Sequence, residues 1–201
     1  MPKNRHTRSR EEKTEELVTI ALRLFLEKGY DGTTMASIGA EAGIATNVVH
    51  WYFPTKDQLF VAALESYQSE SLKELMERPV ESHPDADDRQ LLAERITGLV
   101  WRLVGISSLI AAVHQKSHDS SIVAEFREKT QKRHADYIRE AVDRCHVPKA
   151  EKKLVVEVLI SAFEGLVMHR ASETKTKRTM TFLVEKLTAG APDKYAGSTI
   201  S

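Results

Sequence analysis

The chain has 201 residues, with 29 Lys and Arg residues balanced by 29 Asp and Glu residues, and 41% of its residues are hydrophobic. This composition is typical of a globular protein and argues against a disordered chain or one that coats nucleic acid through net charge. No run approaches the roughly 20 apolar residues of a membrane span, and the single cysteine, Cys145, fits a cytoplasmic protein.

The first helix is expected to begin after Ser9. Ser9 and Glu12 have the Ser-x-x-Glu spacing of a capping box, and an amphipathic stripe of apolar residues follows up to Phe25. The preceding segment is basic, and we interpret it either as an arm that lies along DNA phosphates or as an ordinary solvated tail. Its basic residues are Lys3, Arg5, Arg8 and Arg10.

Two short helices, over residues 34–42 and 45–53, then have the layout of a helix-turn-helix. Apolar anchors recur at Ile38, Ala42, Ile44 and Val49. Gly39 is small where the two helices must approach closely, and Gly43 stands in the turn, where a positive φ is often needed. The alternative is a plain helical hairpin.

Pro54 ends this segment, and Thr55 and Gln58 form a second capping box that opens a longer helix toward Pro79. The acidic, proline-containing stretch at 79–88 is predicted to be an exposed loop. Five further helices are expected, over residues 89–104, 107–116, 120–145, 149–170 and 175–189. The predicted fold class is therefore all-α with about nine helices. Residues 1–55 would form the helix-turn-helix domain and residues 56–201 a larger helical domain, whose first helix connects the two.

The N-terminal quarter resembles the TetR family of transcriptional regulators. The resemblance covers residues 10–65 and rests on four groups of residues: Thr33-Thr34, Ile38, Ala42-Gly43-Ile44, and Tyr52 to Leu59. Beyond it, only the length and the helical layout are similar. The resemblance implies a regulator that binds a palindromic DNA operator as a homodimer. Most members of the family are repressors, so the resemblance also implies that a small-molecule effector releases the protein from DNA. Activation of transcription is the alternative.

In this family the second helix of the motif enters the major groove, and its first half faces the base edges. The residues here would be Thr46, Asn47, Val48 and Trp51. An asparagine can pair with an adenine edge, while Val48 and the Thr46 methyl can touch thymine methyl groups. The resemblance implies phosphate contacts from Thr34, His50, Tyr52 and Lys56.

Two positions depart from the family pattern. Ala45 stands where serine is more usual, and His50 where tyrosine is usual, with an unusual tryptophan beside it. The binding mode is therefore expected to hold while the DNA sequence that is recognised differs. The aromatic residues of this helix could also serve the fold rather than DNA binding. Tyr52 and Phe53 could mainly pack in the core, and Trp51 could be half-buried.

The last two helices are expected to form the dimer interface. From Leu154 to Met168 every residue is apolar except Glu157, Ser161, Glu164 and Gly165, so both sides of the helix must be covered. The predicted interface residues are Val155, Leu159, Ala162, Leu166, Met180, Leu183 and Leu187. A two-fold dimer would place the recognition helices about 34–36 Å apart, in successive major grooves.

The remaining helices could enclose an effector pocket. Its candidate residues are Trp101, His114, Phe126, Tyr137, Phe163 and Met168, each of which could instead be ordinary core. His114 and His118 share a helix face but lack a third ligand, so no metal and no cofactor is expected. No phosphate loop or nucleophile elbow indicates an enzyme. A helical dimer that acts by protein contacts alone is the remaining alternative.

Overall fold

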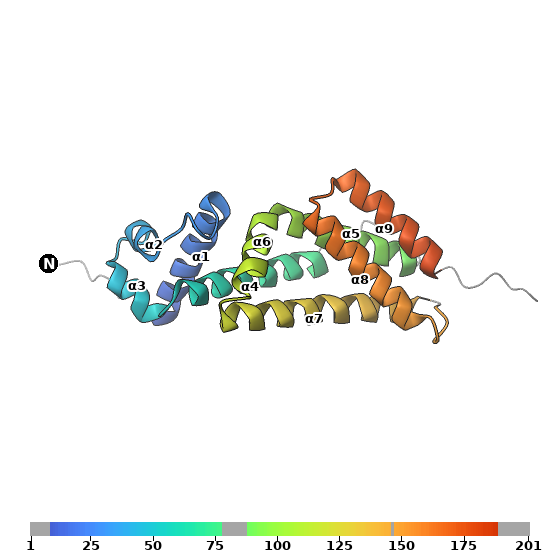
Figure 1. The fold of residues 1–201 in the computed structure, drawn as a ribbon, viewed down its shortest axis with the longest axis horizontal. Helices are drawn as coiled ribbons and strands as arrows, with labels where there is room; N and C mark the ends of the chain where they lie inside the picture. The colour runs from blue at the N-terminus through green and yellow to red at the C-terminus, as the bar shows by residue number, and fades with distance from the viewer. Residues whose placement is uncertain (1–8, 78–87, 146, 189–201) are drawn as a thin grey trace, which may run out of the picture. The chain divides into compact units, whose positions relative to one another are not determined.

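The computed structural model describes residues 9–77, 88–145 and 147–188, and within these ranges the chain forms nine α-helices and no strands (Figure 1). In chain order they are α1 (Arg10–Lys28), α2 (Met35–Glu41), α3 (Thr46–Tyr52), α4 (Lys56–Glu77), α5 (Asp88–Gly105), α6 (Ser107–Lys116), α7 (Ser121–Arg144), α8 (Lys152–Met168) and α9 (Glu173–Thr188). The predicted all-α fold is confirmed. The predicted loop at 79–88 lies almost entirely outside the described residues, as does the basic arm before Ser9.

The helix starts follow from side chains that satisfy the free amides of the first turn. At α1, Ser9 Oγ accepts from the Glu12 amide at 3.1 Å while the Glu12 carboxylate accepts from the Ser9 amide at 2.9 Å. At α4, Thr55 and Gln58 exchange the same pair of bonds, at 3.0 and 3.2 Å. Both predicted capping boxes are therefore confirmed.

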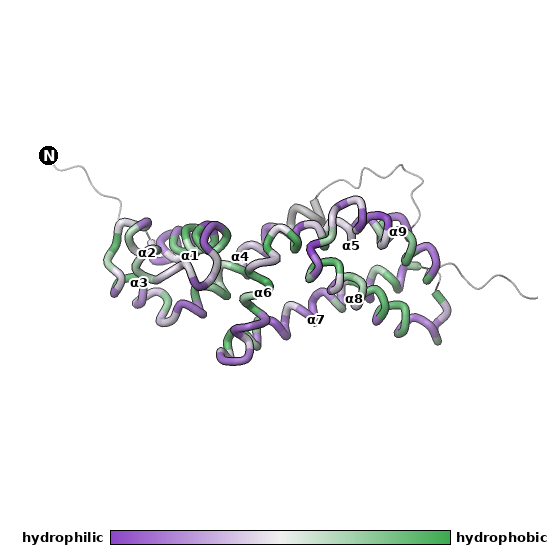
Figure 2. Tube along the Cα trace, turned by 45° about the horizontal axis from the view of Figure 1, so that its top comes forward, coloured by the Kyte–Doolittle hydropathy of each residue, from purple (hydrophilic) through white to green (hydrophobic). Residues whose placement is uncertain are grey.

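The described residues divide into two compact units, one within Met1–Glu74 and Ser108–Glu128, the other within Leu75–Ser107 and Lys129–Ser201. Figure 2 shows hydrophobic and hydrophilic residues alternating along the helices, as amphipathic packing requires. These structural units do not test the predicted division into a DNA-binding domain over residues 1–55 and a larger helical domain over residues 56–201, which stays a prediction.

The core of the first unit contains an aromatic cluster at the junction of α1, α4 and the loop after α1. The ring of Phe60 makes edge contacts with those of Phe25 and Tyr30, both with centroids 4.9 Å apart. Phe25 and Phe60 are fully buried, and Leu17 and Ile38 join them. This cluster fixes the N-terminal end of α4 against the helix that supports the helix-turn-helix.

The core of the second unit lies among α5, α8 and α9, which pack against one another. Its fully buried side chains include Ile96 of α5, Leu159 of α8 and Met180 of α9. In the described part of the chain, no single helix has both the length and the apolar character of a membrane span. Helices α5 and α6 have this length and apolar character only when they are counted as one segment, and the chain bends by 76° between them.

Candidate nucleic-acid interface

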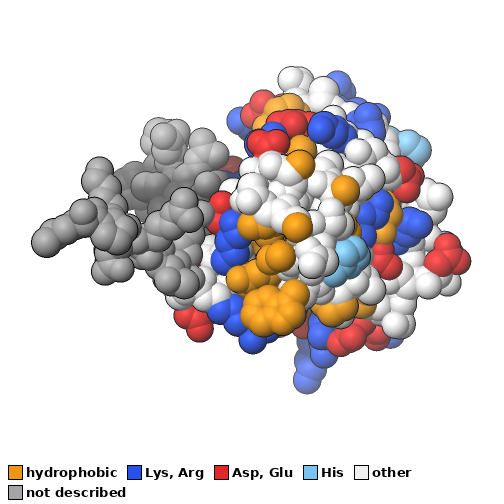
Figure 3. Space-filling model, turned by 90° about the vertical axis from the view of Figure 1, so that its left-hand side faces the viewer, with side chains coloured by type: hydrophobic (Ala, Val, Ile, Leu, Met, Phe, Trp, Pro, Cys, Tyr) orange, Lys and Arg blue, Asp and Glu red, His pale blue; other side chains and the backbone are white. Residues whose placement is uncertain are grey.

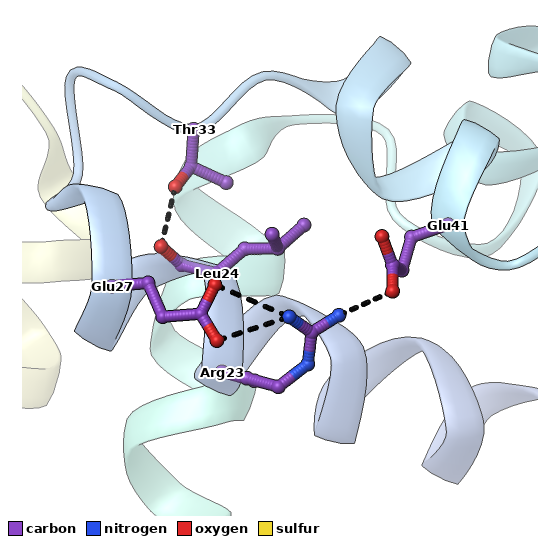
Figure 4. Close-up of polar contacts among 5 residues, drawn as sticks. All are labelled: Arg23, Leu24, Glu27, Thr33 and Glu41. Atoms are coloured by element: carbon purple, nitrogen blue, oxygen red, sulfur yellow. Dashed lines mark hydrogen bonds and ion pairs between the residues drawn. The ribbon is translucent and has the colours of Figure 1, made fainter.

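The loop between α1 and α2 is held by hydrogen bonds from a buried side chain. Thr33 is fully buried, and its hydroxyl lies 3.1 Å from the Leu24 carbonyl oxygen (Figure 4). It also lies 2.9 Å from the Gly29 carbonyl oxygen. Next to it, Thr34 caps α2, because its Oγ1 accepts from the Ser37 amide at 3.0 Å. These two threonines fix where the helix-turn-helix begins.

A surface ion-pair network joins α1 to α2. The Arg23 guanidinium donates to both carboxylate oxygens of Glu27, at 3.1 and 3.2 Å, and reaches Glu41 of α2 at 2.6 Å (Figure 4). All three side chains are about half exposed, so the network contributes little free energy. Its geometry nevertheless orients α2 against α1.

The turn between α2 and α3 depends on two glycines, as the sequence predicted. A Cβ on Gly39 would lie 2.9 Å from the Ile44 carbonyl oxygen and 3.1 Å from Val49 Cγ2, so the two helices approach too closely for a side chain there. Gly43 has φ +65°, a conformation that side-chain-bearing residues rarely adopt. Both predictions from the helix-turn-helix pattern are confirmed.

Helix α3 is anchored on one face and exposed on the other. Val49 is fully buried and Phe53, just after the helix, is 9% exposed. The opposite face presents Thr46, Asn47, Val48, His50 and Trp51, all exposed, with Trp51 the most open at 61%. Viewed from the side that Figure 3 shows, the molecule presents hydrophobic side chains at its surface with Lys and Arg side chains beside them. The face predicted to meet DNA is therefore open to solvent.

The exposed face keeps its recognition groups available. Among the described residues, neither the Asn47 amide nor the Tyr52 hydroxyl has a hydrogen-bond partner. Trp51 packs edge-on against Tyr52, with centroids 4.8 Å apart, and the Arg10 guanidinium lies 4.8 Å from the Trp51 ring centroid. Arg10, at the first position of α1, is thus brought to the recognition helix, a contact that helix periodicity alone could not reveal.

His50 is exposed and its Nδ1 lies 3.1 Å from the Pro54 carbonyl oxygen. A carbonyl oxygen only accepts, so Nδ1 carries the proton in this hydrogen bond. In the neutral imidazole, Nε2 is then an acceptor. His50 must therefore bind a second proton before Nε2 can donate to a phosphate.

Lys56 has an internal role that the sequence did not indicate. Its ammonium donates to the carbonyl oxygens of Tyr30 and Thr33, at 3.0 and 3.1 Å, and lies 3.9 Å from the centroid of the Tyr30 ring. Partial burial lowers the pKa of the ammonium. Two of its three donors are already used, so the predicted phosphate contact would have to be made by the third.

The residue after Lys56 belongs to the same network. The Asp57 carboxylate accepts hydrogen bonds from the Tyr30 hydroxyl and from Ser120. Burial alone would raise the pKa of Asp57, but these two bonds and the charges of Lys116 and Lys56 outweigh it and lower the pKa. The start of α4 is thereby tied to the loop before α2 and to the turn after α6.

The predicted pocket residues fall in both units. His114 and Phe126 belong to the first unit and the other four to the second. Phe126 and Phe163 are buried, and His114 and Tyr137 are half-buried. Trp101 and Met168 are exposed by 48% and 52%, so the chain itself does not enclose them. His134, which is not among the predicted pocket residues, makes an edge contact with the Phe163 ring.

The predicted interface residues of α8 and α9 are largely covered by the chain itself. Val155, Leu159, Leu166 and Met180 are buried, whereas Ala162, Leu183 and Leu187 are half-buried. The large apolar side chains that these helices expose are instead Leu154 (61%), Met168 (52%) and Phe182 (56%). The helices carry an exposed apolar face, but at other positions than those predicted.

Comparison with known proteins supports the predicted resemblance of the N-terminal segment to TetR regulators. Residues 17–63 match the profile of the family described as bacterial regulatory proteins, tetR family. The HTH-type transcriptional regulator YerO of Bacillus subtilis is 33% identical over 64 residues, which are 32% of this chain and 22% of that protein.

Longer similarities extend into the second unit. The HTH-type transcriptional regulator BetI of Burkholderia ambifaria is 24% identical over 81% of this chain and 84% of its own length. The "Probable acrEF/envCD operon repressor" of Escherichia coli K12 is 25% identical over 77% of this chain and 74% of its own. The crystal structure of a transcriptional regulator from Saccharomonospora viridis in complex with choline has a TM-score of 0.66 at 17% identity, covering 88% of this chain and 95% of that one. This likeness shows that the fold is shared.

Proposed function

The chain belongs to the TetR family of bacterial regulatory proteins, and on this premise we propose that it is a repressor that binds a palindromic operator as a homodimer in the cytoplasm. A small-molecule effector would release it from DNA. The observation that carries the proposal is the exposed face of α3, whose Asn47 amide has no partner in the described part of the chain. An anchored helix with a free polar face fits the major groove.

The bases would be read by four side chains. Asn47 would make a bidentate pair with an adenine edge, and Thr46 and Val48 would contact thymine methyl groups. Trp51 would add apolar contact at the edge of the groove. Its stacking with Arg10 places a cation beside it, suited to the adjoining phosphate.

The phosphates would be held by groups around α3. Tyr52 has a hydroxyl without a partner among the described residues, and the capping hydroxyl of Thr34 retains its own proton for a phosphate oxygen. His50 would donate through Nε2 when protonated, and Lys56 through its remaining N–H. Because these contacts ignore sequence, they would set affinity and its salt dependence.

The dimer would form through the face of α8 and α9 that carries Leu154, Met168 and Phe182. Three exposed large apolar side chains on two neighbouring helices are what a partner subunit would cover. The predicted positions that the chain already buries would then support these helices from inside, and Ala162, Leu183 and Leu187 would lie at the edge of the contact.

Repression is the direction suggested by a relative that is named as a probable operon repressor, and an effector that releases the protein from DNA would be the switch. A similarly folded regulator was crystallised with choline, which makes a small organic ligand a reasonable effector class for this chain. A coupling of about 1–3 kcal/mol between effector and operator would suffice. We propose no enzymatic activity, in keeping with the relatives, which are transcriptional regulators.

The test is fluorescence anisotropy with duplexes that flank the protein's own gene. Wild-type protein should bind one duplex far more tightly than a scrambled one. Asn47→Ala should lose about 1–3 kcal/mol of this discrimination, confined to one adenine in each half-site. Lys153→Ala, on the exposed side of α8, is the control and should bind as wild type does. Absent or sequence-independent binding would favour a dimer that acts by protein contacts alone.

A further inference from the structure

The first turn of α1 carries a cation at a place where helix electrostatics favour an acid. Arg10 is the first residue of α1, and Glu11 and Glu12 follow it in the same turn. The N-terminus of a helix has a partial positive charge, which attracts carboxylates and disfavours a guanidinium. Arg10 therefore gains no stability from the helix dipole, and its place in the sequence calls for another reason.

Arg10 differs from the next cation along α1 in what it contacts. The Lys13 ammonium donates to the Glu16 carboxylate at 2.9 Å and to the Ala42 carbonyl oxygen at 3.2 Å, so it holds α1 against the end of α2. Arg10 is exposed, and among the described residues no carboxylate and no carbonyl oxygen pairs with its guanidinium. Lys13 is thus used within the protein, whereas the donors of Arg10 are available to a ligand.

The Trp51 ring is placed to support the Arg10 side chain. Its side chain is 61% exposed, and Tyr52 holds it edge-on, with ring centroids 4.8 Å apart and planes at 89°. The central carbon of the Arg10 guanidinium lies over the Trp51 ring, 4.8 Å from its centroid. This distance is within the range of a cation–π interaction, for which tryptophan is the best aromatic partner. The contact involves no acceptor oxygen, so the N–H groups of the guanidinium can still bind an oxyanion, two at a time.

The recognition helix itself brings no permanent positive charge to DNA. The residues of α3, Thr46–Tyr52, include neither lysine nor arginine, and His50 needs a second proton before it can donate through Nε2. Lys56 already uses two of its donors on the carbonyl oxygens of Tyr30 and Thr33. Because lysine and arginine side chains supply the neutralisation of DNA phosphates, a cation brought to α3 by another helix fills a need that α3 cannot meet.

We propose that Trp51 is a positioning residue, which holds the Arg10 guanidinium for a backbone phosphate beside the groove that α3 enters. This inference rests on the proposed function and deepens it, because it assigns to Trp51 a task other than contact with bases. The phosphate contact belongs to Arg10, and the indole restricts where its guanidinium lies. Trp51 therefore contributes to affinity for every DNA sequence, while Asn47 remains the residue that discriminates among sequences.

The experiment measures how the affinity of the full chain for its operator duplex depends on salt, by fluorescence anisotropy between 50 and 200 mM salt. Arg10→Gln should lower the salt slope by about one, because one phosphate is no longer neutralised. Over this range, wild type should therefore weaken about fourfold more than the variant does. Trp51→Ala should lower the slope by the same amount, although it removes no charge.

Three further variants separate positioning from direct contact. Val48→Ala changes another exposed apolar side chain of α3 and should weaken binding without a change in slope. Trp51→Phe keeps an aromatic face for the guanidinium and should keep the wild-type slope. The double variant Arg10→Gln/Trp51→Ala should lose about one unit of slope and not two, because both changes remove the same contact. Thermal melts without DNA check that each variant is folded.

The inference is overturned if Arg10→Gln or Trp51→Ala retains the wild-type slope, if Trp51→Phe loses it as alanine does, or if the double variant loses twice as much. A loss confined to one base position in Trp51→Ala would also contradict it, since that would make the indole a base contact. These outcomes leave the proposed function intact as long as wild type prefers its operator over a scrambled duplex. A wild type without that preference would contradict both.

Discussion

The ammonium of Lys56 lies 3.9 Å from the centroid of the Tyr30 ring and donates to the carbonyl oxygen of the same residue at 3.0 Å. One side chain thus joins the start of α4 to the loop that precedes the helix-turn-helix. A cation–π contact and hydrogen bonds from a charged donor each contribute about 1 kcal/mol or more when partly buried. Lys56 therefore has a stabilising role beside any contact with DNA.

We expect Lys56→Ala to lower the free energy of unfolding by about 1–3 kcal/mol, measured by urea denaturation. In binding assays at several salt concentrations, it should weaken all DNA sequences about equally and reduce the salt slope by about one. Lys153→Ala removes a lysine whose side chain is 89% exposed and should do neither. A loss restricted to one base position would contradict the phosphate contact, and unchanged unfolding would contradict the internal role.

Asp57 should make stability depend on acid pH. Its pKa in the folded protein lies below the ordinary 3.8, so folding favours the ionised carboxylate. The resulting stabilisation is present above that ordinary value and is lost as pH falls through the lower folded pKa. Asp57→Asn should cost about 1 kcal/mol at neutral pH, and the difference from wild type should shrink toward about pH 3.

Urea midpoints across this pH range measure the effect of Asp57. Asp136→Asn, which removes the exposed partner of Arg139, is the matched control and should change stability by a few tenths of a kcal/mol at most. If the Asp57→Asn difference were the same at every pH, its bonds to Tyr30 and Ser120 would not favour the charged form.

The close approach at Gly39 predicts an asymmetric response to alanine. Gly39→Ala places a methyl group 2.9 Å from the Ile44 carbonyl oxygen, and the strain should lower the free energy of unfolding by about 1–3 kcal/mol. A Cβ on Gly105 meets nothing within 4 Å, so Gly105→Ala should be neutral or slightly stabilising. Equal denaturation midpoints for the two variants would mean that α2 and α3 can separate without cost.

The dimer proposal predicts that a charge at Leu154 separates the subunits. Leu154 is 61% exposed on α8, and a glutamate there would be buried without a partner on association. Light scattering coupled to size exclusion should report a dimer for wild type and a monomer for Leu154→Glu. Leu26→Glu alters another exposed leucine, 42% open on α1, and should leave the dimer intact. A dimeric Leu154→Glu protein would place the interface elsewhere.

The helix-turn-helix could be predicted from sequence because its signals are local. Ser9 and Thr55 mark helix starts through bonds to residues three positions later, and Gly43 marks a turn through its own φ. Such features depend on neighbours along the chain, and periodicity then separates the anchor Val49 from the exposed Asn47.

The exposed positions of the second unit could not be predicted from the sequence, for a physical reason. Helix α8 is apolar on nearly every side, so its hydrophobic pattern does not say which face meets the chain's own core. Val155 and Leu159 were predicted to meet the partner subunit, but they are buried within the chain, whereas Leu154 is exposed. Similarly, the internal role of Lys56 arises from its contacts with Tyr30 and Thr33, in a loop more than 20 residues earlier in the sequence.

The N-cap residue of α3, Ala45, provides no side-chain cap, whereas α1, α2 and α4 each begin with a capping box. Its hold on the protein comes from Val49 and Phe53, on the side turned away from solvent. Substitutions at Thr46, Asn47, Val48 and Trp51 should therefore cost the fold little. The protein could acquire a new target sequence by changing a few surface positions, with its thermal stability left where it was.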